Sequence, residues 1–196
     1  MATGDIKVLQ EEAGPVWTEI DAKTVLAPLA SPTFTGTVTL PTVQMGEASI
    51  KLDPALSAEG KWSGITETGT AGAALAFGDL CYFSVTDSRW ELAKADAAAT
   101  SGGVKLGMCV LAAAGDGSAT EMLLYGKINA AAKFPTLTVG AVCYISAATA
   151  GLIVAGATNA TTGQPTGTDH VIRIIGYANT ADELFFTADQ TYLTHT

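Results

Sequence analysis

The sequence predicts an all-β protein with an N-terminal extended arm, a strand-rich stem, and a compact β-barrel or β-sandwich domain made of two related halves. Three observations support this fold class. A strict apolar–threonine alternation marks the stem, short apolar runs between Gly-rich turns follow it, and those runs contain an internal repeat. The expected regions are the arm at 1–30, the stem at 31–60 and the β domain at 61–196, with repeat units at about 75–128 and 137–187.

The composition favours a protein that packs against copies of itself. Hydrophobic residues make up 48% of the 196 residues, which is enough for a core, while charged residues make up only 15%. An average soluble domain has about 25% charged residues. Thr, Ala, Gly and Ser replace the charged residues. Surfaces made of such small uncharged residues suit self-association. An ordinary β domain with an unremarkable surface is the alternative explanation.

Charge and hydropathy exclude several partners. The formal net charge is −9 and the ten Lys and Arg residues are scattered, so no basic stripe is present and we expect no nucleic-acid partner. No apolar run approaches the roughly 20 residues of a membrane-spanning helix, and the start MATGDIKVLQEE has no apolar signal core. We therefore expect no membrane partner and synthesis in a reducing cytoplasm.

The arm combines a short alternating segment with a weak helical pattern. Ile6 and Val8 alternate with polar residues, which is typical of a strand, and Val16 and Ile20 follow Pro15 at roughly helical spacing. We expect the arm to anchor the protein. The residues expected to make that anchor are Ile6, Val8 and Trp17.

The stem contains the clearest strand pattern in the chain. Over residues 33–40, the residues Phe34, Gly36, Val38 and Leu40 lie on one edge and threonines lie on the other. One isolated strand is not stable in water, so this segment needs partners. Identical chains are the simplest source, and the predicted trimer interface is Phe34, Val38 and Leu40.

Two short runs resemble known families. The run LASPTFTGTVTLP at 29–41 resembles the linker found in tail-fibre and other appendage proteins of tailed bacteriophages. The opening MATGDIKVLQE is similar to that of small virion proteins from such phages. The resemblance implies a virion surface protein. Neither run carries catalytic residues, so it implies no active site.

The internal repeat is visible in two aligned segments. LAFGDLCYFS at 75–84 matches LTVGAVCYIS at 137–146, so Cys81 aligns with Cys143 at an offset of 62 positions. Further along, Glu121 aligns with Glu183 at the same offset, and a glycine pair aligns at an offset of 69. The segment 170–178, HVIRIIGYA, is expected to form one strand.

The C-terminal region also resembles small β-barrel decoration proteins of phage heads. The segments FGDL at 77–80 and KLGMCVLAAAGDG at 105–117 carry this resemblance. It implies a homotrimer on the capsid surface, with the major capsid protein or other virion proteins as partners. It implies no enzymatic activity and no cofactor.

The three cysteines lie far apart, each within an apolar run. An odd number without a CxxC motif argues against both a disulfide framework and a zinc site. We therefore expect buried free thiols.

Candidate catalytic residues are few. Cys143 and His170 could form a nucleophile–base pair, although a core cysteine and a strand-edge histidine are the favoured interpretation. A carboxylate pair could serve a glycosidase, although solvated loop acids explain the same residues. The acidic candidates are Asp87, Glu91, Asp96, Asp116, Glu121, Asp182 and Glu183.

Other possible ligand groups have structural explanations. Asp116, Ser118 and Glu121 offer oxygen ligands but lack the EF-hand spacing, which favours a turn and no metal. The sequon at Asn159 is expected to remain unmodified. Trp17, Trp62 and Trp90 could stack on sugars, but burial in a core or interface is favoured.

Three functions remain open at this stage. The first is a structural virion protein, a trimeric fibre or decoration protein on the capsid. The second is a short tail fibre or fibre tip that binds a host receptor such as a surface glycan. The third is a glycan-cleaving spike.

Overall fold

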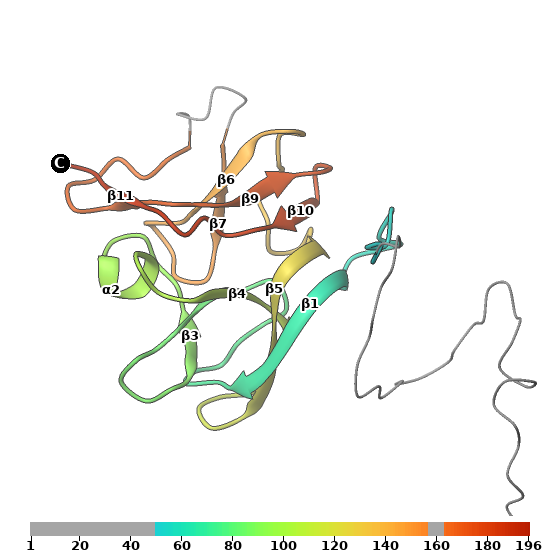
Figure 1. Ribbon diagram of the computed structural model, residues 1–196, viewed down its shortest axis with the longest axis horizontal. Helices are drawn as coiled ribbons and strands as arrows, with labels where there is room; N and C mark the ends of the chain where they lie inside the picture. Colours follow the sequence, from blue (N-terminus) through green and yellow to red (C-terminus); the bar gives the residue numbers. More distant parts are fainter. Residues whose placement is uncertain (1–49, 157–162) are drawn as a thin grey trace, which may run out of the picture. The chain divides into compact units, whose positions relative to one another are not determined.

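The described residues of the computed structural model, 50–156 and 163–196, form eleven β-strands and one helical turn (Figure 1). The all-β fold class is confirmed. The predicted arm and most of the predicted stem lie outside the described residues. So do the predicted anchoring residues Ile6, Val8 and Trp17 and the predicted interface residues Phe34, Val38 and Leu40.

The strands are short apart from two. The first half of the domain contains β1 (Lys61–Thr70), β2 (Leu80–Phe83), β3 (Trp90–Leu92), the turn α2 (Ala98–Ser101), β4 (Leu106–Leu111) and β5 (Ala119–Asn129). The second half contains β6 (Val142–Ile145), β7 (Ile153–Ala155), β8 (Val171–Ile172), β9 (Ile174–Ala178), β10 (Glu183–Phe186) and β11 (Leu193–Thr194).

One antiparallel sheet organises the domain. Its strand order is β3-β2-β4-β5-β10-β9-β6-β7, with β1 paired to β5, and the sheet curls into a half-barrel. A second, small sheet pairs β11 with β8. His195 and His170 extend this pairing, because the His195 amide donates to the His170 carbonyl at 2.8 Å.

The two halves of the sheet repeat one arrangement. Within the first half the order is β3-β2-β4-β5, and within the second it is β7-β6-β9-β10. The register repeats as well, because Cys81 lies opposite Gly107 and Cys143 lies opposite Gly176. These pairs reproduce the offsets of 62 and 69 positions seen in the sequence. The last strands of the halves, β5 and β10, pair with each other and join them.

Strand β5 holds the sheet together. It pairs with β1 along its whole length, while its other edge is shared by β4 near residues 121–123 and by β10 near residues 126–129. Gly126 lies opposite Gly64 of β1. A Cβ at Gly126 would lie 2.3 Å from the Ser63 carbonyl oxygen, so the close approach of the two strands requires glycine there.

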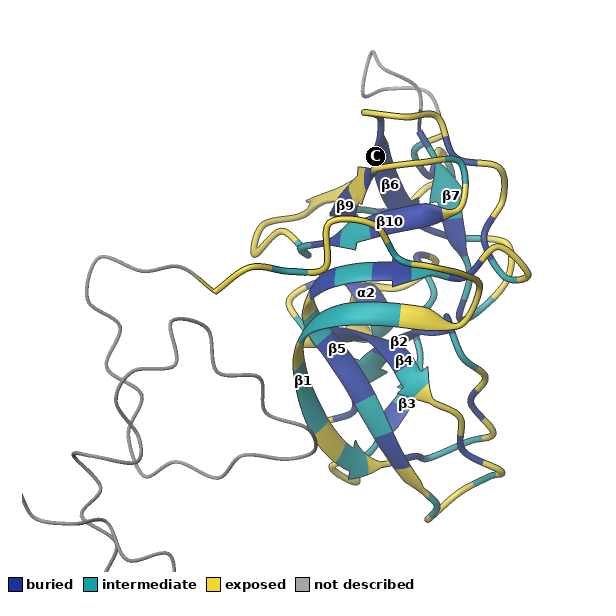
Figure 2. Ribbon diagram, turned by 90° about the vertical axis from the view of Figure 1, so that its right-hand side faces the viewer, coloured by how far each residue is buried: buried dark blue, intermediate teal, exposed yellow. Residues whose placement is uncertain are grey.

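The main core receives side chains from both halves of the domain. In Figure 2 buried segments accordingly occur in strands of both halves, such as β5 and β6. Its large members include Leu80, Met108, Leu123, Ile128, Ile145, Ile175, Leu184 and Phe186. A smaller cluster surrounds Trp90, and it belongs to the first half alone. Each fully buried large side chain contributes about 1.5–3 kcal/mol, so the domain has a core of its own.

Two details differ from the sequence expectations. The predicted single strand at 170–178 is two strands, β8 and β9, interrupted at Arg173. The break falls where the chain passes from the small sheet, in which β8 pairs with β11, to the large sheet, in which β9 pairs with β6 and β10. Residues 50–60, at the end of the predicted stem, form no strand, and the first described strand begins at Lys61.

Candidate functional site

The cysteines are buried free thiols, as predicted. Burial raises the pKa of each: Cys81 well above its usual value, Cys109 above it, and Cys143 to about 11. The Cys109 thiol also donates to the Leu111 carbonyl at 3.3 Å. A nucleophilic cysteine needs a thiolate near neutral pH, so these side chains behave as small apolar core residues.

The raised pKa of Cys143 predicts a loss of stability in alkali. The thiol ionises near pH 9 in the unfolded chain and near pH 11 in the folded protein. Ionisation of Cys143 therefore leaves stability unaffected below about pH 9 and lowers it as pH rises to about 11, by a total of about 3 kcal/mol. Urea denaturation at pH 8 and pH 10.5 measures this loss. The variant Cys143→Ala should lose less stability over that interval than the wild type, and an equal loss would contradict the assignment.

The structure does not form the Cys143–His170 pair. The His170 Nδ1 atom accepts a hydrogen bond from the Gly167 amide at 3.1 Å. The Cys143 thiol is hydrogen-bonded with the backbone of Gly156. In the described part of the chain no hydrogen bond joins the two side chains, which agrees with the favoured interpretation of a core cysteine and a strand-edge histidine.

The aligned acids Glu121 and Glu183 do not form a carboxylate pair. Glu121 lies near the start of β5, whereas Glu183 lies opposite Asn129 at the end of β5. Eight strand positions separate these points, or about 26 Å at the usual rise per residue. Glycosidase carboxylates lie about 5–9.5 Å apart. These two residues therefore cannot act together on one glycosidic bond.

Two of the remaining candidate acids form local ion pairs. Asp116 forms an ion pair with Arg89, and Asp96 forms one with Lys94 at 2.6 Å. Burial, followed by the nearby charge of Asp87, raises the pKa of Glu91. Within residues 50–156 and 163–196, no group of three or more His, Cys, Asp or Glu side chains is placed to hold a metal ion.

The GD pair of the FGDL segment also has a structural role. Gly78 has a φ of 83°, and the buried Asp79 carboxylate accepts a hydrogen bond from the Ala76 amide at 2.7 Å. The same carboxylate forms an ion pair with Lys133 at 2.5 Å. This pair closes the turn into β2 and fastens it to the segment that follows β5.

The tryptophans of the domain are core residues. Trp90 is fully buried and packs edge-to-face with Phe83 at 5.3 Å between ring centroids. Trp62 is half-buried and packs against the main core. Trp17 lies outside the described residues. Burial of Trp90 is confirmed, so its ring offers no platform for a sugar.

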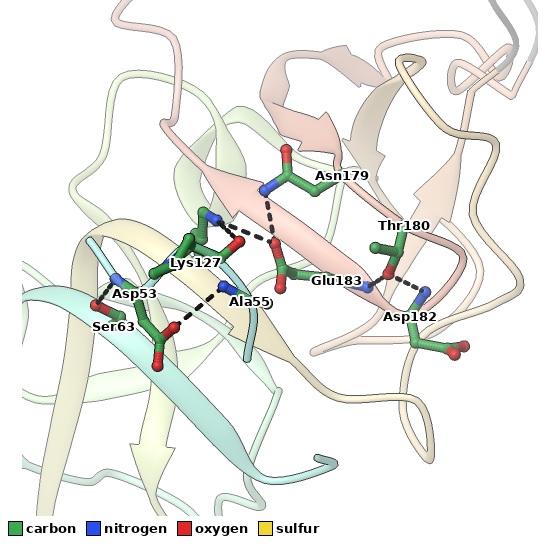
Figure 3. Close-up of polar contacts among 9 residues, drawn as sticks. Asp53, Ala55, Ser63, Lys127, Asn179, Thr180, Asp182 and Glu183 are labelled. Carbon is green, nitrogen blue, oxygen red and sulfur yellow. Dashed lines mark hydrogen bonds and ion pairs between the residues drawn. The ribbon is translucent and has the colours of Figure 1, made fainter. Parts of the chain in front are cut away.

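A polar clamp fastens the segment before β1 to the domain (Figure 3). The Lys127 ammonium group donates to the Pro54 carbonyl at 3.0 Å and lies 3.7 Å from Glu183 Oε1. The Asn179 side chain donates to the same carboxylate oxygen at 2.7 Å. Because Glu183 is buried, the Lys127–Glu183 ion pair is shielded from solvent and fixes the position of the lysine.

A second contact fastens the same segment. The Asp53 amide donates to the Ser63 hydroxyl at 3.0 Å, and the Ala55 amide donates to the Asp53 carboxylate at 3.1 Å. A hollow of about 450 Å³ lies between residues 54–56 and the strands β5 and β10. The chain therefore enters the domain along a fixed path.

Removal of the clamp lysine should release the entry segment. In Lys127→Met the Pro54 carbonyl loses its donor and the buried Glu183 carboxylate loses its cation, at a cost of about 1–3 kcal/mol. Hydrogen exchange in residues 50–60 should become faster, as measured by mass spectrometry. The matched control is Lys51→Met, which removes an exposed lysine from the segment itself. Unchanged exchange in Lys127→Met would contradict the role of the clamp.

A groove with a volume of about 430 Å³ lies where the two halves meet. Residues 103–106 of the first half line it, and so do Thr187, Ala188 and Gln190 of the second half. Tyr125 and Arg173 also line it. Sequence reasoning missed this groove, because its residues are distant in the chain and share no motif.

Comparisons with known proteins identified no relative: no family model, no curated protein and no solved structure matches this chain. Within the described residues no helix is both long enough and apolar enough to cross a membrane.

Proposed function

We propose that this chain is a structural protein of a tailed-bacteriophage virion, a homotrimer that displays the β domain on the capsid surface. Residues 1–30 anchor it to the major capsid protein or to other virion proteins. Residues 31–60 form the stem, in which the predicted strand at 33–40 intertwines with those of two other chains. The role is mechanical, and it requires neither a catalytic residue nor a cofactor.

The observation that carries this proposal is how the chain enters the domain. The SPTFTGT run at 31–37, which resembles phage appendage linkers, precedes the segment at 53–54 that Lys127 and Ser63 fix. The entry segment leads directly into β1, which pairs along the whole of β5. A tensile force applied to the N-terminal region would therefore act on the β1–β5 pair, the longest strand pair of the sheet. That arrangement suits a domain displayed on a stem.

The test is the protein composition of virions from the phage whose genome encodes this chain. Mass spectrometry of purified particles should detect the chain at a fixed copy number divisible by three. Complete and stable particles that lack this chain would overturn the proposal.

A short tail fibre or fibre tip is the second candidate, because the groove lined by Tyr125 and Arg173 offers a place for a receptor. Copy number separates the two locations. A hundred or more copies per particle indicates head decoration, whereas a few to a few dozen copies indicates a tail organelle.

A further inference from the structure

Arg173 is an unusual residue for the interior of a β domain. Its side chain is 4% exposed, and Nε donates to the Asp189 carbonyl at 2.8 Å. Nη1 donates to the carbonyls of Ser101 at 3.2 Å and Val104 at 2.8 Å, and also to that of Gly102. The guanidinium is therefore rigidly held, and it ties β9 to the loop that precedes β4.

This buried cation has no carboxylate bonded to it. Its hydrogen-bond partners in the described chain are all backbone carbonyls. The nearby Asp189 carboxylate is exposed and accepts hydrogen bonds from the Thr191 amide at 2.9 Å and hydroxyl at 3.0 Å. Buried charges are ordinarily paired, because an unpaired one is costly. The positive charge of Arg173 thus lacks a bonded counter-ion.

One edge of the guanidinium remains available. Nη2 donates to no described residue, and it is not among the fully buried unpaired atoms, so it reaches solvent. Arg173 lines the groove between the two halves. A fixed donor and a positive charge therefore face a cavity of about 430 Å³.

The other walls of the groove supply an aromatic ring and further polar groups. Tyr125 is 45% exposed and is held by an edge-to-face contact with Phe185 at 5.2 Å. Lys105 and Gln190 also line the groove. The Lys105 ammonium group is paired with Glu67 and lies 5.5 Å from the centroid of the Trp90 ring. Cavities of about 300–1,000 Å³ with a few convergent polar groups are typical of small-ligand sites.

We propose that this groove binds the carboxylate group of an acidic sugar. The carboxylate accepts hydrogen bonds from Nη2 of Arg173 and supplies a hydrogen-bonded counter-ion. The sugar ring packs against Tyr125, because aromatic rings offer an apolar face to the C–H groups of a sugar. Gln190 donates to a ring hydroxyl. The inference holds whether the protein is mounted on the head or on the tail.

The direct test is saturation-transfer NMR on the full-length protein with glucuronate, galacturonate and N-acetylneuraminate. At least one should bind at millimolar concentration, and its methyl ester should bind about tenfold more weakly, because the ester loses a charge-assisted hydrogen bond. Absence of transfer from all three acids would overturn the proposal. So would equal binding of acid and ester, which would indicate recognition of hydroxyl groups alone.

Exposed tyrosines provide a matched pair of variants. Tyr125→Ala should weaken binding about tenfold, whereas Tyr177→Ala, which removes a 46%-exposed tyrosine that does not line the groove, should leave it unchanged. Equal effects of the two variants would place the ligand elsewhere. A peptide carboxylate that competes as well as the sugar acid would overturn the assignment to a sugar.

Discussion

The full-length chain carrying Val38→Asp is expected to be monomeric, whereas the wild type is expected to be a trimer. In the proposed stem, Phe34, Val38 and Leu40 of three chains meet at one axis. The substitution places three like charges there, and burial of unpaired carboxylates should cost several kcal/mol per trimer. The domain spanning 49–196 has its own core and should stay folded. Multi-angle light scattering gives the oligomeric state, and circular dichroism reports the fold.

Thr37→Asp is the matched control for this experiment. It adds the same charge one position earlier, on the opposite edge of the predicted strand. The control should remain a trimer. A wild type that is monomeric at micromolar concentration, or a Val38→Asp variant that stays trimeric, would show that this strand packs within its own chain.

The sequence predicted the fold class and the repeat because both depend on local patterns. Apolar runs such as LCYF and VCYI, each preceded by a glycine turn, indicate short buried strands without knowledge of their partners. The matched offsets then predicted equivalent strands. Cys81 opposite Gly107 and Cys143 opposite Gly176 occupy equivalent places in the two halves.

The groove and the clamp could not be predicted, because they depend on contacts between distant residues. Lys127 reaches a carbonyl 73 positions away, and Arg173 reaches Ser101 across 72 positions. Their acceptors are backbone carbonyls, which carry no signature in the sequence. Arg173 lies within the segment 170–178, for which the sequence pattern predicts one uninterrupted strand. Its burial follows only from the loop that packs over it.

The same limit applies to β5, because no local pattern in the sequence revealed its pairing with three strands. The largest loss of stability is expected from a substitution in this strand. Gly126→Ala should lower the free energy of unfolding by about 3 kcal/mol or more, because a Cβ would lie 2.3 Å from the Ser63 carbonyl oxygen at a φ of 140°. Strand β1 cannot retreat, since it pairs with β5 along ten residues. The control Gly115→Ala, in a loop with no atom within 4 Å of the new Cβ, should change stability by less than about 0.5 kcal/mol. Urea denaturation followed by tryptophan fluorescence measures both. Equal midpoints for the two variants would show that β1 and β5 do not approach this closely.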